Sequence, residues 1–514
     1  VNTDLSNAIA QGWFAIGVAS RDNVTGYYIN FQGWNEANIP YLTIDYTPPV
    51  PGPVLQAGIV FPATGNTLTN FAYSVQYLHT EGTAPVSAKV YIRPDALSAW
   101  TDYNLVYPTG TPDYTLWQTF TYTTTLALGT DYEYYFEFDD GVTRAVAVFP
   151  TTAPGTPASG PDVYTPISGT LEINAAGGGD YLSFAECFAD LNLRGTDGNT
   201  VNVEVYGNYA ASDPILGNVP GANASGWINF YPAVGETVTI TGTGGTTSAP
   251  LRTFGASYVS FTGFNLTGGG NAGIIIDDSH HIKISHCNIY TNGWLGLSIK
   301  SGSNNVTAWN NFIWGNFTQQ IALYDNGIDC DIALYNNSVY ADGATGAEYH
   351  TGMTLSNSEV AAYNNIIHRN WNGGNAFSVV HVQSQDWTTH PNTLLDYNVY
   401  HNQDGSTIFP TFATLADWQA SGAGQDANSL QGNPYYINGP AGDLHIVIGA
   451  SPAYQNGIDL ALMGVVDDFD GDLRTINPLY DIGADVIVPV AYPAPVDQVV
   501  TNLTHNTATL GWTE

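Results

Sequence analysis

The sequence predicts an all-β protein whose central part is a β-solenoid and whose flanks are smaller β modules. Short apolar strands recur at steps of 23 to 32 residues through the middle of the chain, without helices between them. Strands nearer the N-terminus alternate apolar and polar residues, and Pro-rich segments separate the two patterns. With 33 Tyr, 20 Phe and 12 Trp in 514 residues, the chain has enough aromatic residues for a large core, so we expect it to be folded nearly throughout.

Two modules are predicted before the solenoid. Residues 1–47 contain strand-like runs that end in Ile39–Tyr46, and we interpret them as the C-terminal part of a β-sandwich module that begins before Val1. Residues 48–161 start with a stiff Pro-rich linker and continue with short alternating strands such as Tyr132–Phe138. This segment resembles bacterial immunoglobulin-like modules, which are β-sandwiches.

The solenoid is predicted over residues 162–488. One apolar position recurs at Leu266, Ile289, Ile313, Val339, Ile367 and Val399. A second strand follows the same rhythm as residue pairs two apart, whose members point the same way: Ile274/Ile276, Leu297/Ile299, Ile321/Leu323, Met353/Leu355 and Val380/Val382. Stacking of such coils places these residues in columns inside the solenoid.

Polar residues are also expected to form a column. Asn311, Asn337 and Asn365 occupy equivalent positions beside Cys287. Amide side chains stacked one coil apart can hydrogen-bond along the column, so we expect an asparagine ladder at one corner. We interpret Cys287 as a small buried residue of the same column.

A helix is predicted at the N-terminal end of the solenoid. Ser183 and Glu186 have the spacing of a capping box, and Gly195 is a stop signal. Apolar residues follow on one side of this helix: Phe184, Cys187, Phe188 and Leu191.

Residues 162–488 resemble the right-handed parallel β-helix family, the pectate-lyase-like superfamily. The repeat, the helix and a closing motif in which Asp467–Arg474 precedes Asp481–Asp485 carry this resemblance. It implies a right-handed solenoid whose open end is covered by the helix, and many members of the superfamily cleave polysaccharides. Residues 489–514 resemble the opening strands of a fibronectin type III module that continues beyond Glu514.

Charge and composition exclude several classes of function. The 10 Lys and Arg against 45 Asp and Glu give a formal charge of −35, which argues against nucleic acid and anionic membrane surfaces as partners. No apolar run is long enough to span a bilayer. The three cysteines form no CxxC pair, which disfavours a zinc site of that type. The many acidic residues and few lysines suit a secreted, extracellular protein at a cell surface, where cations screen the charge.

Four residues are candidate catalytic groups in an enzymatic interpretation. Strand alternation turns Lys300 outward, above Asp277 on one coil and below Tyr324 on the next, and His381 lies two coils further in a neighbouring column. Such a row suits proton abstraction or charge neutralisation in a saccharide groove. The alternative is a surface ion pair between Lys300 and Asp277.

A calcium site is the second candidate. Asp467, Asp468, Asp470 and Asp472 surround Gly471, and hard cations such as Ca²⁺ prefer several carboxylate oxygens from a tight loop. The alternative is a structural turn in which an aspartate pairs with Arg474.

These features favour a structural interpretation. We expect an extracellular component of a fibre, sheath, surface layer or adhesin, with the β-helix as a rigid platform and with copies of itself, other surface proteins or polysaccharide as partners. Two alternatives stay open: a polysaccharide lyase or glycoside hydrolase acting in a groove on the β-helix, and a non-catalytic carbohydrate-binding adhesin.

Overall fold

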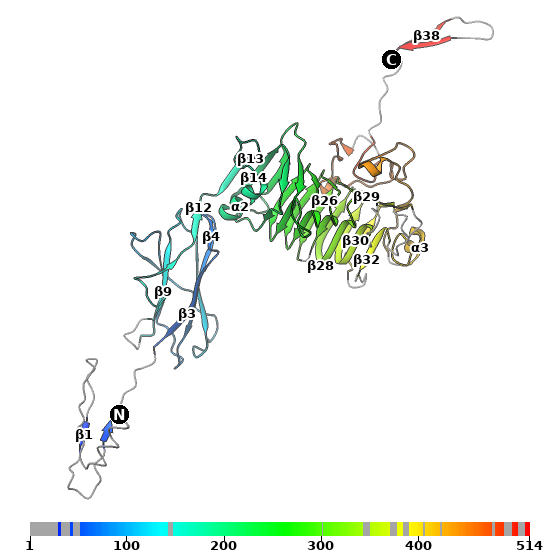
Figure 1. Cartoon of the computed structure of the whole chain (residues 1–514). Coiled ribbons are helices and arrows are strands. Elements are labelled where there is room, and N and C mark those ends of the chain that lie inside the picture. The colour runs from blue at the N-terminus through cyan, green and yellow to red at the C-terminus, as the bar shows by residue number, and fades with distance from the viewer. Residues whose placement is uncertain are drawn as a thin grey trace.

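The computed structural model shows a β-sandwich followed by a parallel β-helix (Figure 1). The structure describes residues 29–31, 42–44, 52–141, 147–300, 302–342, 350–370, 378–383, 390–403, 407–421, 424–474, 479–487, 496–501 and 509–513. Of the two terminal modules predicted from the sequence, it describes only two-stranded pairs: β1 (Ile29–Phe31) with β2 (Leu42–Ile44), and β38 (Val496–Thr501) with β39 (Thr509–Thr513). The rest of both modules lies outside the described residues.

The sandwich consists of two antiparallel sheets around one apolar core. One sheet has the order β3 (Val54–Phe61), β5 (Phe71–Leu78), β8 (Gln118–Thr124). The other has the order β10 (Ala147–Phe149), β9 (Glu133–Asp139), β6 (Ser87–Arg93), β7 (Thr101–Asn104), with β11 (Ala158–Ser159) also paired to β9. Alternate residues of β5 are buried because only one face of the strand meets the other sheet.

The sandwich is joined to the solenoid by a defined contact. Strand β4 (Thr64–Asn66) pairs in parallel with β12 (Asp162–Tyr164), which leads into the first coil. The side chain of Asn66 is buried, and its Nδ2 donates to the carbonyl oxygens of Arg194 and Thr196 at 3.0 Å each. These bonds hold the sandwich against the end of the capping helix.

The solenoid is a right-handed parallel β-helix, as the sequence predicts, and its coils contribute to three parallel sheets. The sheet that is clearest to follow has nine strands, one from each coil: β15 (Tyr209–Ala211), β18 (Thr239–Gly242), β21 (Asn265–Thr267), β24 (Asn288–Tyr290), β27 (Phe312–Trp314), β29 (Ser338–Asp342), β31 (Ile366–Asn370), β34 (Val399–Asn402) and β35 (Leu430–Gln431).

The other two sheets meet where two long strands turn the corner between them. The first sheet contains β16 (Ile215–Leu216), β19 (Leu251–Phe254), β22 (Ala272–Asp277), β25 (Leu295–Ile299) and β32 (Val380–Gln383). The second contains β13 (Ile167–Asn174), β14 (Thr196–Tyr206), β17 (Ile228–Pro232), β20 (Ser257–Thr262), β23 (His280–Ser285), β26 (Asn304–Trp309) and β33 (Leu394–Asp396). Strands β28 (Gln319–Tyr335) and β30 (Thr351–Tyr363) belong to both.

The predicted apolar columns are confirmed with one correction. All five residue pairs spaced by two, from Ile274/Ile276 to Val380/Val382, lie in register on successive coils. In the nine-stranded sheet, however, the partner of Ile367 is Tyr400, whereas Val399 pairs with Ile366. The placement of Val399 in the inner column was therefore wrong by one residue. Tyr400 points inward instead, because its hydroxyl reaches the buried Asp426 at 2.9 Å.

The asparagine ladder is present and longer than predicted. Asn311, Asn337 and Asn365 each donate from Nδ2 to the side-chain oxygen of the next member, at 2.9, 3.0 and 3.1 Å, and the ladder ends at Asn398. Cys287 is fully buried at the other end, and its backbone N–H donates to Asn311 Oδ1. A second ladder, which the sequence analysis missed, joins Asn292, Asn316 and Gln320 at 2.8 Å per step.

The predicted capping helix is α2 (Phe184–Arg194). Its four buried residues are the four apolar residues expected from the sequence. Ser183 caps the N-terminus by accepting from the backbone N–H of Glu186, and Gly195 ends the helix with a φ of 65°. The Glu186 carboxylate accepts from Leu182 N–H, one residue before the cap, so the capping box is only half formed. The helix covers strand edges that would otherwise be open to pairing.

The chain after the ninth coil folds back along the nine-stranded sheet as a C-terminal cap, defined here as residues 432–474 and 479–487. It contains β36 (Tyr436–Asn438), β37 (Asp443–Ile446) and two short 3₁₀ turns, Gly439–Ala441 and Ala461–Met463, and it follows a short helix, α3 (Leu415–Ala420). A second column of residues faces the cap. Each of them has a left-handed φ and directly precedes a residue of the column that contains the asparagine ladder: His286, Asn310, Asn336 and Asn364. Each of these side chains hydrogen-bonds to the cap, which fixes the cap across four coils.

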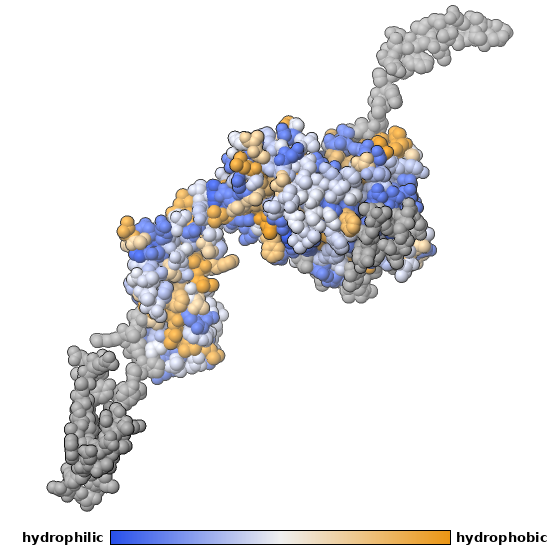
Figure 2. All heavy atoms as spheres, in the orientation of Figure 1, coloured by the Kyte–Doolittle hydropathy of each residue, from blue (hydrophilic) through white to orange (hydrophobic). Residues whose placement is uncertain are grey.

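On the face shown in Figure 2, the solenoid is covered mostly by residues of intermediate hydropathy, with small apolar areas among them. More continuous apolar areas are visible on the sandwich in the same view. Among the described residues, no helix has the length and apolar character needed to cross a membrane.

Candidate functional site

The row of candidate catalytic residues is in register on the outer face of the sheet that contains β22 and β25. Ile276 pairs with Ile299 and Ile299 with Leu323, so Asp277, Lys300 and Tyr324 follow one another on three successive coils. His381 pairs with Thr354 and lies in the neighbouring outward column, as expected. The structure thus brings these residues to one face.

The side chains of Asp277 and Tyr324 nevertheless have other partners. The Asp277 carboxylate lies 3.7 Å from the guanidinium of Arg252, which also contacts Asp213 at 3.0 Å. The Tyr324 hydroxyl donates to Gln319 Oε1, and burial raises the pKa of this tyrosine. Within the described part of the chain, no ion pair joins Lys300 to Asp277. The catalytic role of the row stays a prediction.

Burial affects His381 as well. Loss of hydration lowers the pKa of this imidazole, because burial disfavours the charged form of a base. His381 is therefore neutral near pH 7, and a neutral imidazole can accept a proton or donate a hydrogen bond but supplies no positive charge to a uronate carboxylate.

Three of the four aspartates of the predicted calcium loop, Asp467, Asp468 and Asp470, have carboxylates with different partners. Asp468 is buried, and its Oδ1 accepts the backbone N–H groups of Asp470 and Asp472 while Oδ2 accepts that of Val486. The Asp467 carboxylate faces His286 at 3.2 Å. The calcium site stays a prediction.

Arg474 lies beneath this loop and hydrogen-bonds to backbone carbonyl groups around it. Its guanidinium is buried and donates to the carbonyl oxygens of Asp467 and Gly483 at 2.6 and 2.9 Å and to Asn310 Oδ1 at 2.9 Å. Burial lowers the pKa of Arg474 to about 10, so the residue still carries its charge at neutral pH. This positive charge lies beneath a loop that is rich in carboxylates and so offsets part of their mutual repulsion.

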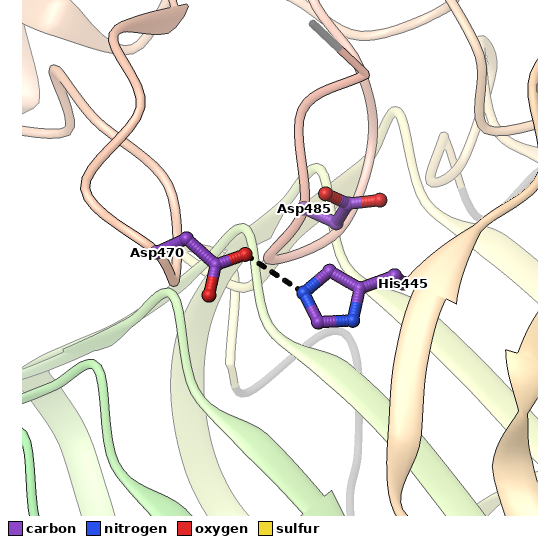
Figure 3. A group of neighbouring side chains, drawn as sticks. All are labelled: His445, Asp470 and Asp485. Carbon is purple, nitrogen blue, oxygen red and sulfur yellow. Dashed lines mark hydrogen bonds and ion pairs between the residues drawn. The ribbon is translucent and has the colours of Figure 1, made fainter.

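A further group of side chains, which the sequence analysis did not identify as a site, lies in the C-terminal cap. His445 on β37, Asp470 in the loop after Asp468 and Asp485 near the end of the cap each present one ligand atom, and these three atoms lie within 4.8 Å of one another. Figure 3 shows His445 and Asp470 facing each other, with Asp485 on the neighbouring segment. We call these three residues the cap triad.

Hydrogen bonds on both ring nitrogens orient His445. Nδ1 lies 2.6 Å from Asp443 Oδ1, and Nε2 lies 2.8 Å from Asp470 Oδ2. The ring also packs edge-on against Phe312, with 5.1 Å between centroids. Burial alone would lower the pKa of His445, but the two carboxylate hydrogen bonds outweigh it and raise the pKa.

Asp485 is the buried member of the cap triad. It is 7% exposed, and its Oδ2 accepts the backbone N–H of Ile446 at 2.8 Å. Burial raises the pKa of Asp485 to about 6, and the neighbouring carboxylates of Asp468 and Asp470 add to this shift. At neutral pH the group is thus held as a carboxylate in a place that disfavours negative charge.

Only some features of the sequence point to the residues of the cap triad. Asp443 and His445 alternate on one strand, and Asp485 belongs to the closing motif that supports the family resemblance. Their approach depends on how three segments of the cap pack on the nine-stranded sheet. No spacing rule predicts that packing.

Comparison with known proteins supports the fold and leaves the site open. Residues 233–339 match the family model described as "Right handed beta helix region". The search of curated proteins gives no match.

Solved structures that are similar to this chain include two carbohydrate-active enzymes. A family 28 exopolygalacturonase from Yersinia enterocolitica is 10% identical over 74% of this chain and 98% of that chain, with a TM-score of 0.15. The catalytic domain of a GH87 α-1,3-glucanase in complex with nigerose is 12% identical over 68% and 80% of the two chains, with a TM-score of 0.13. Similarities at this level carry no argument about function.

Proposed function

We propose that the chain is a structural component of an extracellular surface or filament, in which the β-helix is a rigid platform. The observation that supports this best is the continuity of the buried framework. The ladder from Asn311 to Asn398 runs without a break through four coils, and the C-terminal cap is bonded to four successive coils on the outside.

The junction with the sandwich extends this framework. Asn66 is fully buried and bonds to the two carbonyls at the end of the capping helix, so a load applied to the sandwich is passed to the first coil through hydrogen bonds as well as through the chain. Rigid coupling of this kind is what a spacer between modules needs.

Both ends of the solenoid are covered by other parts of the chain, the first by α2 and the last by α3 and its flanking loops. Covered ends disfavour end-to-end growth by strand addition. Contacts between copies are therefore expected on the lateral faces or through the modules.

Electron microscopy of the native material tests the proposal. A regular polymer or surface array that contains this chain is the expected result. A protein that stays monomeric and monodisperse at every salt and divalent-cation concentration, with no array on the cells that produce it, would count against it.

A second candidate, a polysaccharide lyase or hydrolase, is supported by one observation: Lys300 is in register between Asp277 and Tyr324 on an outward face. Incubation with polygalacturonate, alginate and neutral glucans, followed by detection of unsaturated products and reducing ends, tests it. Activity that is lost in Lys300→Ala and retained in Lys283→Ala, a lysine on another sheet that stacks on Trp227, would establish the enzyme and displace the structural proposal.

A further inference from the structure

We propose that the cap triad binds a divalent transition-metal ion, for which Zn²⁺ is the probe, and that this ion fastens three segments of the C-terminal cap to one another. The proposal is independent of the structural role proposed above. It concerns His445, Asp470 and Asp485, and it differs from the calcium loop in using an imidazole and a residue outside that loop.

The first argument is the orientation of His445. Asp443 Oδ1 lies 2.6 Å from Nδ1 and can hold the proton on that nitrogen. Nε2 then presents its lone pair toward Asp470 Oδ2 at 2.8 Å. Two acceptors at this distance repel, so in the metal-free chain a proton on Nε2 makes the hydrogen bond to Asp470, and a bound ion would take the place of that proton. A carboxylate behind a histidine that presents its other nitrogen is also the usual arrangement around protein-bound zinc.

The second argument is independent of the first and comes from Asp485. This side chain is more than nine-tenths buried, yet only Oδ2 has a hydrogen-bond partner among the described residues, the N–H of Ile446. One of its oxygens lies within 4.8 Å of the presented atoms of both His445 and Asp470. Taking this carboxylate largely out of water is costly even with one backbone hydrogen bond, and a cation held at that point would reduce the cost.

The chemistry of the three ligands selects the class of ion. Calcium and magnesium prefer oxygen ligands alone, whereas an imidazole nitrogen combined with carboxylates suits zinc and its neighbours in the first transition row. Asp470 is exposed and His445 is partly exposed, so the ion has a path of entry and an open side for water.

The position of the ligands defines what the ion would do. His445 comes from β37, Asp470 from the loop that Arg474 holds, and Asp485 from the last described segment of the cap. One ion would therefore add a link among three segments that hydrogen bonds already join, among them His445 to Asp470 and Ile446 N–H to Asp485. Binding to the folded state alone raises the temperature of unfolding.

Calorimetric titration of the full 514-residue chain with Zn²⁺, after treatment with a chelator, tests the proposal. We expect one ion bound per chain, with loss of this binding in His445→Gln and in Asp485→Asn. Asp443→Asn should weaken binding by about 10–100-fold, since Asp443 orients the imidazole. The matched control is Asp459→Asn, a carboxylate of the same cap that caps the turn at Ala461 and should leave binding unchanged.

A second readout separates loss of the ion from loss of the fold. Each variant is checked by near-ultraviolet circular dichroism without metal, and Co²⁺ then replaces Zn²⁺ as the probe, because its visible absorption reports nitrogen and oxygen ligands directly. A Co²⁺ spectrum that disappears in a folded His445→Gln chain supports the proposal. Absence of stoichiometric binding, or binding of equal strength in His445→Gln and Asp485→Asn, would overturn it and leave an imidazolium bridging Asp443 and Asp470.

Discussion

Replacing Asn337 by Ala in the middle of the asparagine ladder should destabilise the solenoid strongly. Asn337 is fully buried, and its Nδ2 donates to Ala308 O at 2.9 Å and to Asn365 Oδ1 at 3.0 Å. Its Oδ1 accepts the backbone N–H and the Nδ2 of Asn311 at 3.2 and 2.9 Å. The substitution removes four hydrogen bonds and leaves a void in the corner of the coil.

The magnitude follows from the groups that lose their partners. Asn311 Nδ2 still has Ile284 O, and Asn365 Oδ1 still accepts Asn337 N–H. The backbone N–H of Asn311 loses its ladder partner, and Ala308 O loses one donor. Two buried groups at about 1–3 kcal/mol each, together with a small cavity, give a loss of about 3–5 kcal/mol in the free energy of unfolding.

Urea unfolding followed by circular dichroism measures this loss. Asn265→Ala is the matched control, because Asn265 is an outward residue of β21 in the same sheet, and it should change the free energy of unfolding by less than about 0.5 kcal/mol. Equal effects of the two substitutions would contradict this prediction, since they would mean that an amide of the ladder contributes no more to stability than a surface amide.

Three further predictions concern titration and the C-terminal cap. The pKa of Asp485 is about 6 in the folded chain, above its unfolded value, so in metal-free protein its contribution to stability is full below about pH 4 and is lost as the pH rises through 6. Between pH 4 and 7 the free energy of unfolding should fall by about 3 kcal/mol because of this group, and the fall should be absent in Asp485→Asn. Urea unfolding at each pH measures it. His368 should show the opposite dependence of stability on pH. Burial and the nearby His401 lower the pKa of its imidazole to about 3. The neutral imidazole contributes its full stability above about pH 6.5, and this contribution falls as the pH is lowered. His368→Phe should therefore reduce the acid-induced loss in the free energy of unfolding by up to about 5 kcal/mol. An unchanged pH profile of stability would contradict this. Asn310→Gly, which keeps the left-handed backbone but loses the bonds to the cap, should speed proteolysis of the cap at least several-fold, whereas Asn305→Gly, with the same φ of 52° on the exposed surface, should not.

The stacking of the coils could be predicted from the sequence because the same contacts form between each coil and the next. Every coil must bury the same two or three apolar positions, so a pattern such as Ile274/Ile276 and Leu297/Ile299 fixes the register without knowledge of the rest of the chain. The same argument predicted the ladder, since an amide that stacks once can stack on each following coil.

The error at Val399 shows where this reasoning ends. The last predicted step is the longest, and alignment on apolar character selected a valine over the neighbouring tyrosine. The structure places Tyr400 inside because Asp426, from a later segment, accepts its hydroxyl hydrogen bond. Val399 instead packs beneath the cap with Ile446 and Ile482. Both facts depend on segments outside the repeat.

The cap triad was missed for the same reason. His445, Asp470 and Asp485 are far apart in the sequence and follow no period. Their approach results from the return of the chain along the nine-stranded sheet, where His286, Asn310, Asn336 and Asn364 hold it. Sequence patterns predict the sheet but not the path of a segment that crosses it.

A density map of the full chain would show whether the coils stack as described. We expect parallel rungs about 4.8 Å apart in which the inner residues superimpose along one axis: Leu266, Ile289, Ile313, Val339, Ile367 and Tyr400. The amides of Asn311 to Asn398 should form a second line. A map in which these side chains face different directions, or in which the amides contact solvent, would contradict it.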